Sequence, residues 1–174
     1  MNVQELILNH YRSRDFISKH QHFIENTELL PELIEVANSK LSYPFPEYAS
    51  WWLFHIARSN AIVLIPFHQQ FIDCVLENEN GTVLRNSLGI LLEFPMIKYK
   101  EGLLLDRLFH LLVDENYKVA TQVYSLYLLI EFTKKYPEIK QEVLEIIKIK
   151  AEKPHTPALK MGVKNYLKAI ESIH

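Results

Sequence analysis

The sequence predicts an all-α protein built as a solenoid of stacked helix pairs. Four segments share one pattern of apolar residues, aligned on Ala49, Leu84, Ala120 and Leu159, at intervals of 35, 36 and 39 residues. Each follows another stretch with helical periodicity, and repeats of this length with two helices per unit are typical of α-solenoids. The chain has 4 glycines in 174 residues, and 48% of its residues are hydrophobic. This composition favours packed helices with short loops over disorder or a sheet with many tight turns.

The N-terminal segment, residues 1–26, lies outside the repeat and is expected to cap one end of the stack. Asn2 can cap a helix that runs to about Tyr11, because its side chain can accept hydrogen bonds from the first backbone amides. Ser13 can cap a second helix, which holds Phe16, Ile17, His20 and Ile24.

The first expected helix pair occupies residues 27–60, with helices near 29–38 and 46–60. Apolar residues of its first helix follow the i, i+3, i+4, i+7 spacing of one buried face: Leu30, Leu33, Ile34 and Ala37. Pro31 suits the first turn of that helix, where a missing N–H costs nothing. Pro44 and Pro46 indicate a turn after that helix, and Pro46 can begin the second helix.

Three more pairs are expected, over residues 61–95, 96–135 and 136–174. Their first helices are expected near 66–77, 102–113 and 138–150, and their second helices near 82–93, 117–134 and 157–173. Pro66 can open the first of these helices, and Asn78-Glu79-Asn80-Gly81 has the composition of a turn. No stretch of the sequence indicates a strand.

Several of these features resemble the HEAT/armadillo-like repeat family from about Leu29 to the C-terminus. The resemblance is carried by Pro31, Pro46 and Pro66, by Ala49-Ser50-Trp51-Trp52-Leu53, and by Thr82-Val83-Leu84-Arg85-Asn86-Ser87-Leu88-Gly89-Ile90-Leu91. It implies one domain, a right-handed α-α superhelix of about four helix pairs whose second helices line a concave face. Proteins of this family mostly bind other macromolecules, so we expect a protein-binding or scaffold module whose partner is a protein or peptide.

Polar and aromatic residues of the second helices are the candidates for that concave face. The repeat alignment matches Trp51 with Asn86, Gln122 and Met161, and Ser50 with Arg85, Thr121 and Lys160. Tryptophan and arginine dominate binding hot spots, and guanidinium and amide groups can hold a carboxylate, a peptide backbone or a phosphate. The expected binding residues are Trp51, His55, Arg58, Arg85, Asn86 and Gln122. The alternatives are packing of the tryptophans against the first helix pair, and polar side chains that are solvated or bonded between repeats.

Charge is unevenly distributed along the sequence. Residues 1–87 carry 6 Lys/Arg and 10 Asp/Glu, whereas residues 88–174 carry 13 and 11, which gives −4 and +2. Lys160, Lys164 and Lys168 form one basic strip on the last helix, either as a solvated face or as a docking strip for an acidic partner. An end-to-end homodimer is also compatible with the sequence, because the last helix is expected to expose an apolar flank.

The alternative function is nucleic-acid binding or DNA glycosylase activity. The chain is distantly similar to the HEAT-like DNA alkylation repair proteins, which use tryptophans, an aspartate and an arginine on a basic concave face. Trp51 and Arg85 match this set, but the residues four beyond the two tryptophans are His55 and Ile56, neither of them acidic. The net charge of −2 also provides no overall attraction to nucleic acid.

The sequence predicts no catalytic residue, metal site or cofactor. It lacks a glycine-rich phosphate loop, a G-x-S-x-G motif and the Cys and His spacings of metal sites. The single cysteine, Cys74, lies in an apolar helical stretch and is expected in the core, which fits a reducing compartment. No apolar run approaches the ~18 residues of a membrane span, and the N-terminus does not resemble a secretion signal, so a cytoplasmic protein is expected.

Overall fold

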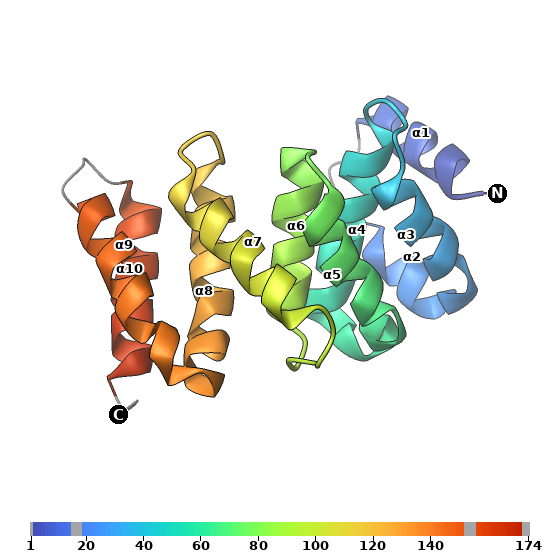
Figure 1. The fold of residues 1–174 in the computed structure, drawn as a ribbon. Coiled ribbons are helices and arrows are strands. Elements are labelled where there is room, and N and C mark those ends of the chain that lie inside the picture. The colour runs from blue at the N-terminus through green and yellow to red at the C-terminus, as the bar shows by residue number, and fades with distance from the viewer. Residues whose placement is uncertain (1, 15–18, 152–155, 172–174) are drawn as a thin grey trace. The chain divides into compact units, whose positions relative to one another are not determined.

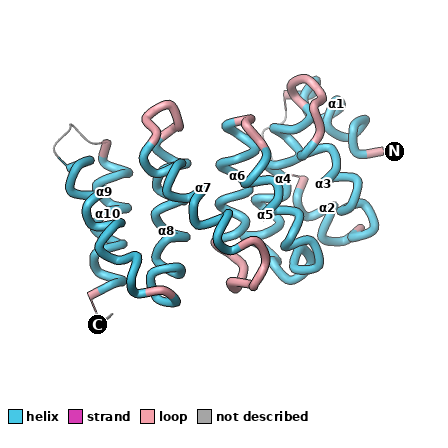
Figure 2. Tube along the Cα trace, in the orientation of Figure 1, coloured by secondary structure: helices cyan, strands magenta, loops and turns pink. Residues whose placement is uncertain are grey.

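The computed structural model describes residues 2–14, 19–151 and 156–171, and the regular elements in these ranges are all helical (Figures 1 and 2). The chain divides into two compact units, Met1–Pro95 and Met96–His174. We call them the N-terminal unit and the C-terminal unit. The all-α prediction is therefore confirmed.

The N-terminal unit contains six α-helices within the described ranges. They are α1 (Val3–Ser13), α2 (His20–Glu25), α3 (Leu30–Asn38), α4 (Phe45–Asn60), α5 (His68–Glu77) and α6 (Gly81–Leu91), with 3₁₀ helices at Thr27–Leu29 and Ala61–Phe67. Helices α3 and α4 pack as one pair, α5 and α6 as the next, and the second helices α4 and α6 pack against each other. Helices α1 and α2 both pack against α4.

Capping residues fix where these helices begin. The Asn2 side chain accepts from the Glu5 amide at 2.8 Å, and the Glu5 carboxylate accepts from the Asn2 amide, a reciprocal capping box. The Asn80 Oδ1 accepts from the first amides of α6, those of Thr82 and Val83. Pro31 and Pro46 lie in the first turns of α3 and α4, as predicted.

Two expectations about helix starts are wrong. Ser13 does not cap a second helix, because it is the last residue of α1 and its hydroxyl donates to the His10 carbonyl oxygen. Helix α2 begins only at His20, and the expected positions of Phe16 and Ile17 lie outside the described residues. Pro66 does not open α5, since it lies within the 3₁₀ helix that precedes His68.

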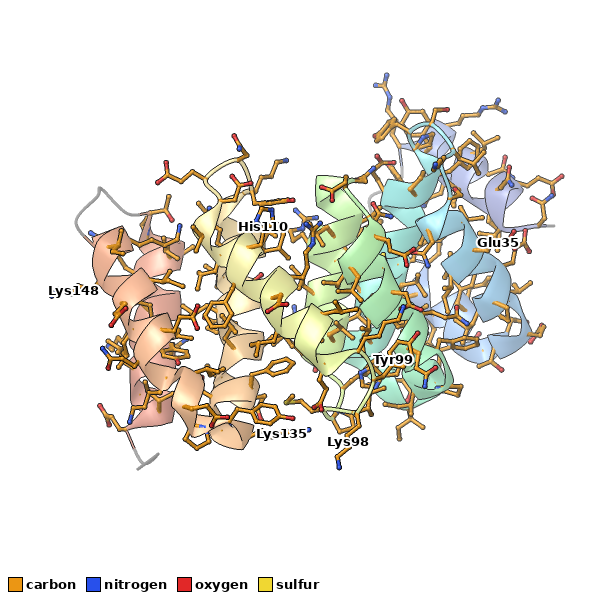
Figure 3. The ribbon with its side chains drawn as sticks, viewed as in Figure 1. Glu35, Lys98, Tyr99, His110, Lys135 and Lys148 are labelled. Atoms are coloured by element: carbon orange, nitrogen blue, oxygen red, sulfur yellow. The ribbon has the colours of Figure 1, made fainter. Side chains whose placement is uncertain are left out.

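The C-terminal unit contains four α-helices within the described ranges. They are α7 (Glu101–Val113), α8 (Val119–Lys135), α9 (Lys140–Ala151) and α10 (Pro157–Ile170), with a 3₁₀ helix at Pro137–Ile139. Helix α8 packs against both α7 and α10. Lys135, labelled in Figure 3 at the end of α8, pairs with the Glu101 carboxylate at the start of α7, and this contact holds the pKa of Glu101 below its ordinary value.

The second helices differ in whether the aligned residue is buried. Ala49, Leu84 and Leu159 are buried, but Ala120 is half-buried, and the buried residues that follow it in α8 are Thr121, Gln122 and Val123. Gln122 can be buried because its amide is hydrogen bonded: Gln122 Nε2 donates to the Tyr117 carbonyl oxygen at 3.0 Å.

Candidate functional site

One face of α4 carries three of the expected binding residues. Trp51, His55 and Arg58 stand at i, i+4 and i+7, so their side chains leave the helix on the same side. Trp51 and His55 are half-buried and Arg58 is exposed. Trp52, on the neighbouring side, is 0% exposed and belongs to the core, where its ring lies 5.4 Å from that of Phe23. The two tryptophans therefore have different surroundings, as the helical spacing predicts.

Aromatic contacts hold the Trp51 side chain in place. Its ring centroid lies 5.2 Å from that of His55 at an interplanar angle of 89°, and 6.0 Å from that of Tyr48 at 82°. The ring of His10, from α1, lies 6.1 Å away on a tilted plane. Edge-to-face arrangements of this kind are favourable beyond the area they bury. Trp51 is thus a fixed part of the surface.

Two exposed tyrosines extend this surface. Tyr11, from α1, is 42% exposed, and Tyr43, in the loop before α4, is 58% exposed. Their ring centroids lie 5.5 Å apart at 88°, and each ring also contacts Tyr48, at 6.0 and 6.3 Å. We call Tyr11, Tyr43, Tyr48, Trp51 and His55 the aromatic face. The sequence did not indicate that these tyrosines lie together, because they come from three different elements. The number of tyrosines in the chain, 9, was the one feature of the sequence that could have indicated an aromatic surface.

The surroundings of His55 favour its neutral form. Burial lowers the pKa of His55, and electrostatic interactions with His20 and Arg58 lower it further. The His20 ring from α2 lies 5.7 Å from that of His55. The Arg58 guanidinium carbon lies 5.7 Å from the Phe54 ring centroid, a cation–π contact. Arg58 is therefore the fixed positive charge at this end of the aromatic face.

Asn86 lies in the interior rather than on a surface. It is 3% exposed, and its Nδ2 donates to the Ser50 Oγ at 3.0 Å, which joins α6 to α4. Its Oδ1 accepts from Nη2 and Nε of Arg85, at 3.2 and 3.4 Å. The half-buried Arg85 guanidinium is thereby oriented by the interior amide. The amide thus forms a hydrogen bond between repeats, the alternative that the sequence left open.

A family model for the HEAT repeat domain matches residues 10–170. The chain belongs to the HEAT repeat family. No curated protein and no solved structure matches it. The family explains why helices pack in pairs here and why neighbouring second helices, α4 with α6 and α8 with α10, pack against each other.

The remaining expected residues of this HEAT repeat protein lie in the C-terminal unit. Gln122 is 5% exposed, and its Oε1 accepts from the Lys150 Nζ at 3.0 Å, so its amide serves the interior. The lysine strip of α10, Lys160, Lys164 and Lys168, is exposed throughout.

Neither a metal site nor a reactive thiol is found among the described residues. Within them, no three His, Cys, Asp or Glu side chains come together as a metal site. The Cys74 thiol is buried 3.2 Å from the Ser87 hydroxyl, and burial raises its pKa to about 11, so it is a poor nucleophile. No helix within the described ranges combines the length and apolar character needed to cross a bilayer.

Proposed function

We propose that this HEAT repeat chain is a non-enzymatic protein-binding module that recognises a peptide segment of another protein. The proposed contact surface is the aromatic face with Arg58 and Arg85. The observation that supports it is the combination of exposed tyrosines, a fixed tryptophan and an arginine on one side of α4. Tyrosine, tryptophan and arginine are the residues most enriched among binding hot spots.

The aromatic face would bind with little loss of conformational freedom. Its rings already hold one another in edge-to-face contacts, as Tyr11, Tyr43 and Tyr48 do. Side chains that are fixed before binding lose less entropy in the complex, which increases affinity. In this proposal Arg58 supplies the charge for a carboxylate or a backbone carbonyl of the peptide, whereas Asn86 orients Arg85 and does not touch the partner.

We further propose that the chain works as one HEAT repeat domain. In this proposal residues 1–26 form the cap, and the four repeats cover approximately residues 27–60, 61–95, 96–135 and 136–174. Supporting it, the boundary between the two compact units, at residues 95 and 96, coincides with a proposed repeat boundary.

The test is affinity capture from native extract with matched variants. The variant Tyr43→Ala/Arg58→Ala truncates two exposed side chains, and Glu35→Ala is the control, since Glu35 is an exposed residue of α3 (Figure 3). A partner retained by wild type and Glu35→Ala should bind the double variant at least ~10-fold more weakly, which corresponds to ~1.4 kcal/mol or more. Equal binding of that partner to all three proteins would refute the proposed surface.

The same face allows the nucleic-acid alternative to be tested. Trp51 is half-buried beside tyrosine and histidine rings, so a duplex stacking on this face would change its fluorescence. We expect no change when a DNA duplex is titrated at low salt. A fluorescence change that is lost in Arg58→Ala would instead assign the face to nucleic acid.

A further inference from the structure

A groove of about 610 Å³ opens in the N-terminal unit, and none of its lining residues belongs to the aromatic face. Its walls are the C-terminal ends of α3 and α5 and the turn between α5 and α6. Three carboxylates line it, those of Asp73, Glu77 and Glu79, against the single ammonium group of Lys40 among its described lining residues. Leu41 also lines it and is 40% exposed.

The groove attracts cations for two reasons. Its carboxylates outnumber its ammonium group by two. In addition, Asn38 and Glu77 are the last residues of α3 and α5, and the C-terminal end of a helix carries partial negative charge. A partner for this groove must therefore present positive charge.

The chain itself carries a surface of the required kind. Lys160, Lys164 and Lys168 are all exposed on α10 at i, i+4 and i+8, and successive members stand ~6 Å apart along the helix axis. Asp73 and Glu77 stand at i and i+4 on α5, with the same axial spacing. Of these two carboxylates Glu77 is the exposed one, so a lysine helix lying alongside α5 would meet it first.

The two compact units have net charges of opposite sign. Residues 1–95 contain 6 Lys/Arg and 11 Asp/Glu, which gives −5, whereas residues 96–174 contain 13 and 10, which gives +3. These values sum to the −2 of the whole chain. The N-terminal unit of one molecule and the C-terminal unit of another therefore attract each other before any specific contact forms.

We propose that the acidic groove of one copy takes the lysine strip of α10 from a second copy, so that the protein self-associates head to tail. The two surfaces differ, so the contact is heterologous, and association continues from copy to copy unless the geometry closes a ring. None of the residues of the proposed peptide-binding surface takes part in this contact, so self-association and peptide binding can be tested separately.

The first test is analytical ultracentrifugation of the intact protein over a concentration series. At ~0.01 M ionic strength the screening length is ~30 Å, and at ~1 M it is ~3 Å. We expect the average mass to rise above 20.5 kDa with concentration at the lower salt and to return to 20.5 kDa at the higher salt. A mass of 20.5 kDa at every concentration in low salt would overturn the proposal.

A charge exchange then tests the two surfaces. One variant, Glu77→Lys/Glu79→Lys, reverses the groove, and another, Lys164→Glu/Lys168→Glu, reverses the strip; all four residues are exposed, so both variants should fold. Each variant alone should remain monomeric, because its groove and strip then have like charge. A mixture of the two should associate, because each groove meets a strip of opposite charge. The proposal is wrong if the groove variant self-associates as wild type does, or if the folded variants stay monomeric when mixed.

Discussion

The buried hydrogen bond between Asn86 and Ser50 should make a measurable contribution to the stability of the N-terminal unit. Asn86→Ala removes the bond to the Ser50 hydroxyl and the bonds from Arg85, and it leaves a small cavity at a site that is 3% exposed. A hydrogen bond contributes ~1 kcal/mol net, so we expect a loss of ~2–3 kcal/mol. Ser50→Ala leaves the Asn86 Nδ2 as a buried donor without this acceptor, which should cost ~1–3 kcal/mol.

The double variant Ser50→Ala/Asn86→Ala distinguishes loss of this hydrogen bond from a general loss of packing. Once Asn86 is gone, Ser50→Ala should add little, so the two single losses should exceed the double loss by ~1 kcal/mol, within the range for residues in contact. The assay is urea unfolding followed by tryptophan fluorescence. Both tryptophans, Trp51 and Trp52, lie in the N-terminal unit, so the signal reports that unit alone. Gln21→Ala, which removes an exposed side-chain hydrogen bond to Glu25, is the control and should change stability by less than ~0.5 kcal/mol.

Two results would refute the reasoning. Strict additivity of the two single variants would show that the amide and the hydroxyl do not act as a pair. A change of less than ~0.5 kcal/mol for Asn86→Ala would show that the amide exchanges its partners for water without loss, contrary to the cost of burying an unsatisfied polar group.

Three further predictions concern packing, protonation and the thiol. Gly162→Leu should lower the stability measured by thermal unfolding by ~1–3 kcal/mol, because a Cβ added at Gly162 would lie 3.3 Å from the Val123 Cγ1. Gly102→Leu should be neutral or stabilising, because a Cβ added there would have nothing within 4 Å. Burial lowers the pKa of His68 in the folded protein, so the unfolded chain binds a proton at this residue more readily. The free energy of unfolding should therefore keep its full value above about pH 6.5 and fall as the pH drops through the pKa of the folded state. In His68→Gln this fall should be shallower. Cys74 should resist a thiol reagent in the native protein and react after unfolding in urea, because its pKa is raised to about 11; rapid native labelling would contradict its burial.

Much of the fold follows from local signals in the sequence. Pro31, Pro46 and Asn80 occupy helix starts because a fixed φ or a capping oxygen suits that place and few others. The apolar spacing of α3 identified its buried face, because residues at this spacing lie on one side of a helix. The prediction from Ser13 was wrong because a serine hydroxyl can form hydrogen bonds at the end of a helix as well as at its start. The Ser13 hydroxyl donates to the His10 carbonyl oxygen at the end of α1.

The candidate site was less accessible to sequence reasoning. Ala120 was aligned with the buried Ala49 but is itself half-buried, whereas the polar Gln122 is buried and hydrogen bonds to residues outside its own helix. Asn86 was placed on a surface because the repeat alignment matched it with Trp51, yet it is 3% exposed. Its partner Ser50 lies 36 residues away, and only the packing of α6 on α4 brings the two together.

Polar bonds across the seams also limit how neighbouring repeats can slide. An interface made only of Leu, Ile and Val tolerates small displacements along the helix axis, because one methyl group replaces another at little loss. A shift of one turn, ~5.4 Å, would separate Asn86 from Ser50, and an equal shift in the C-terminal unit would separate the Tyr166 and Thr133 hydroxyls, now 2.9 Å apart. The packing of α6 on α4 and that of α10 on α8 therefore each have one axial alignment that satisfies these polar atoms, so within each unit the two helices can tilt about the contact more readily than they can slide.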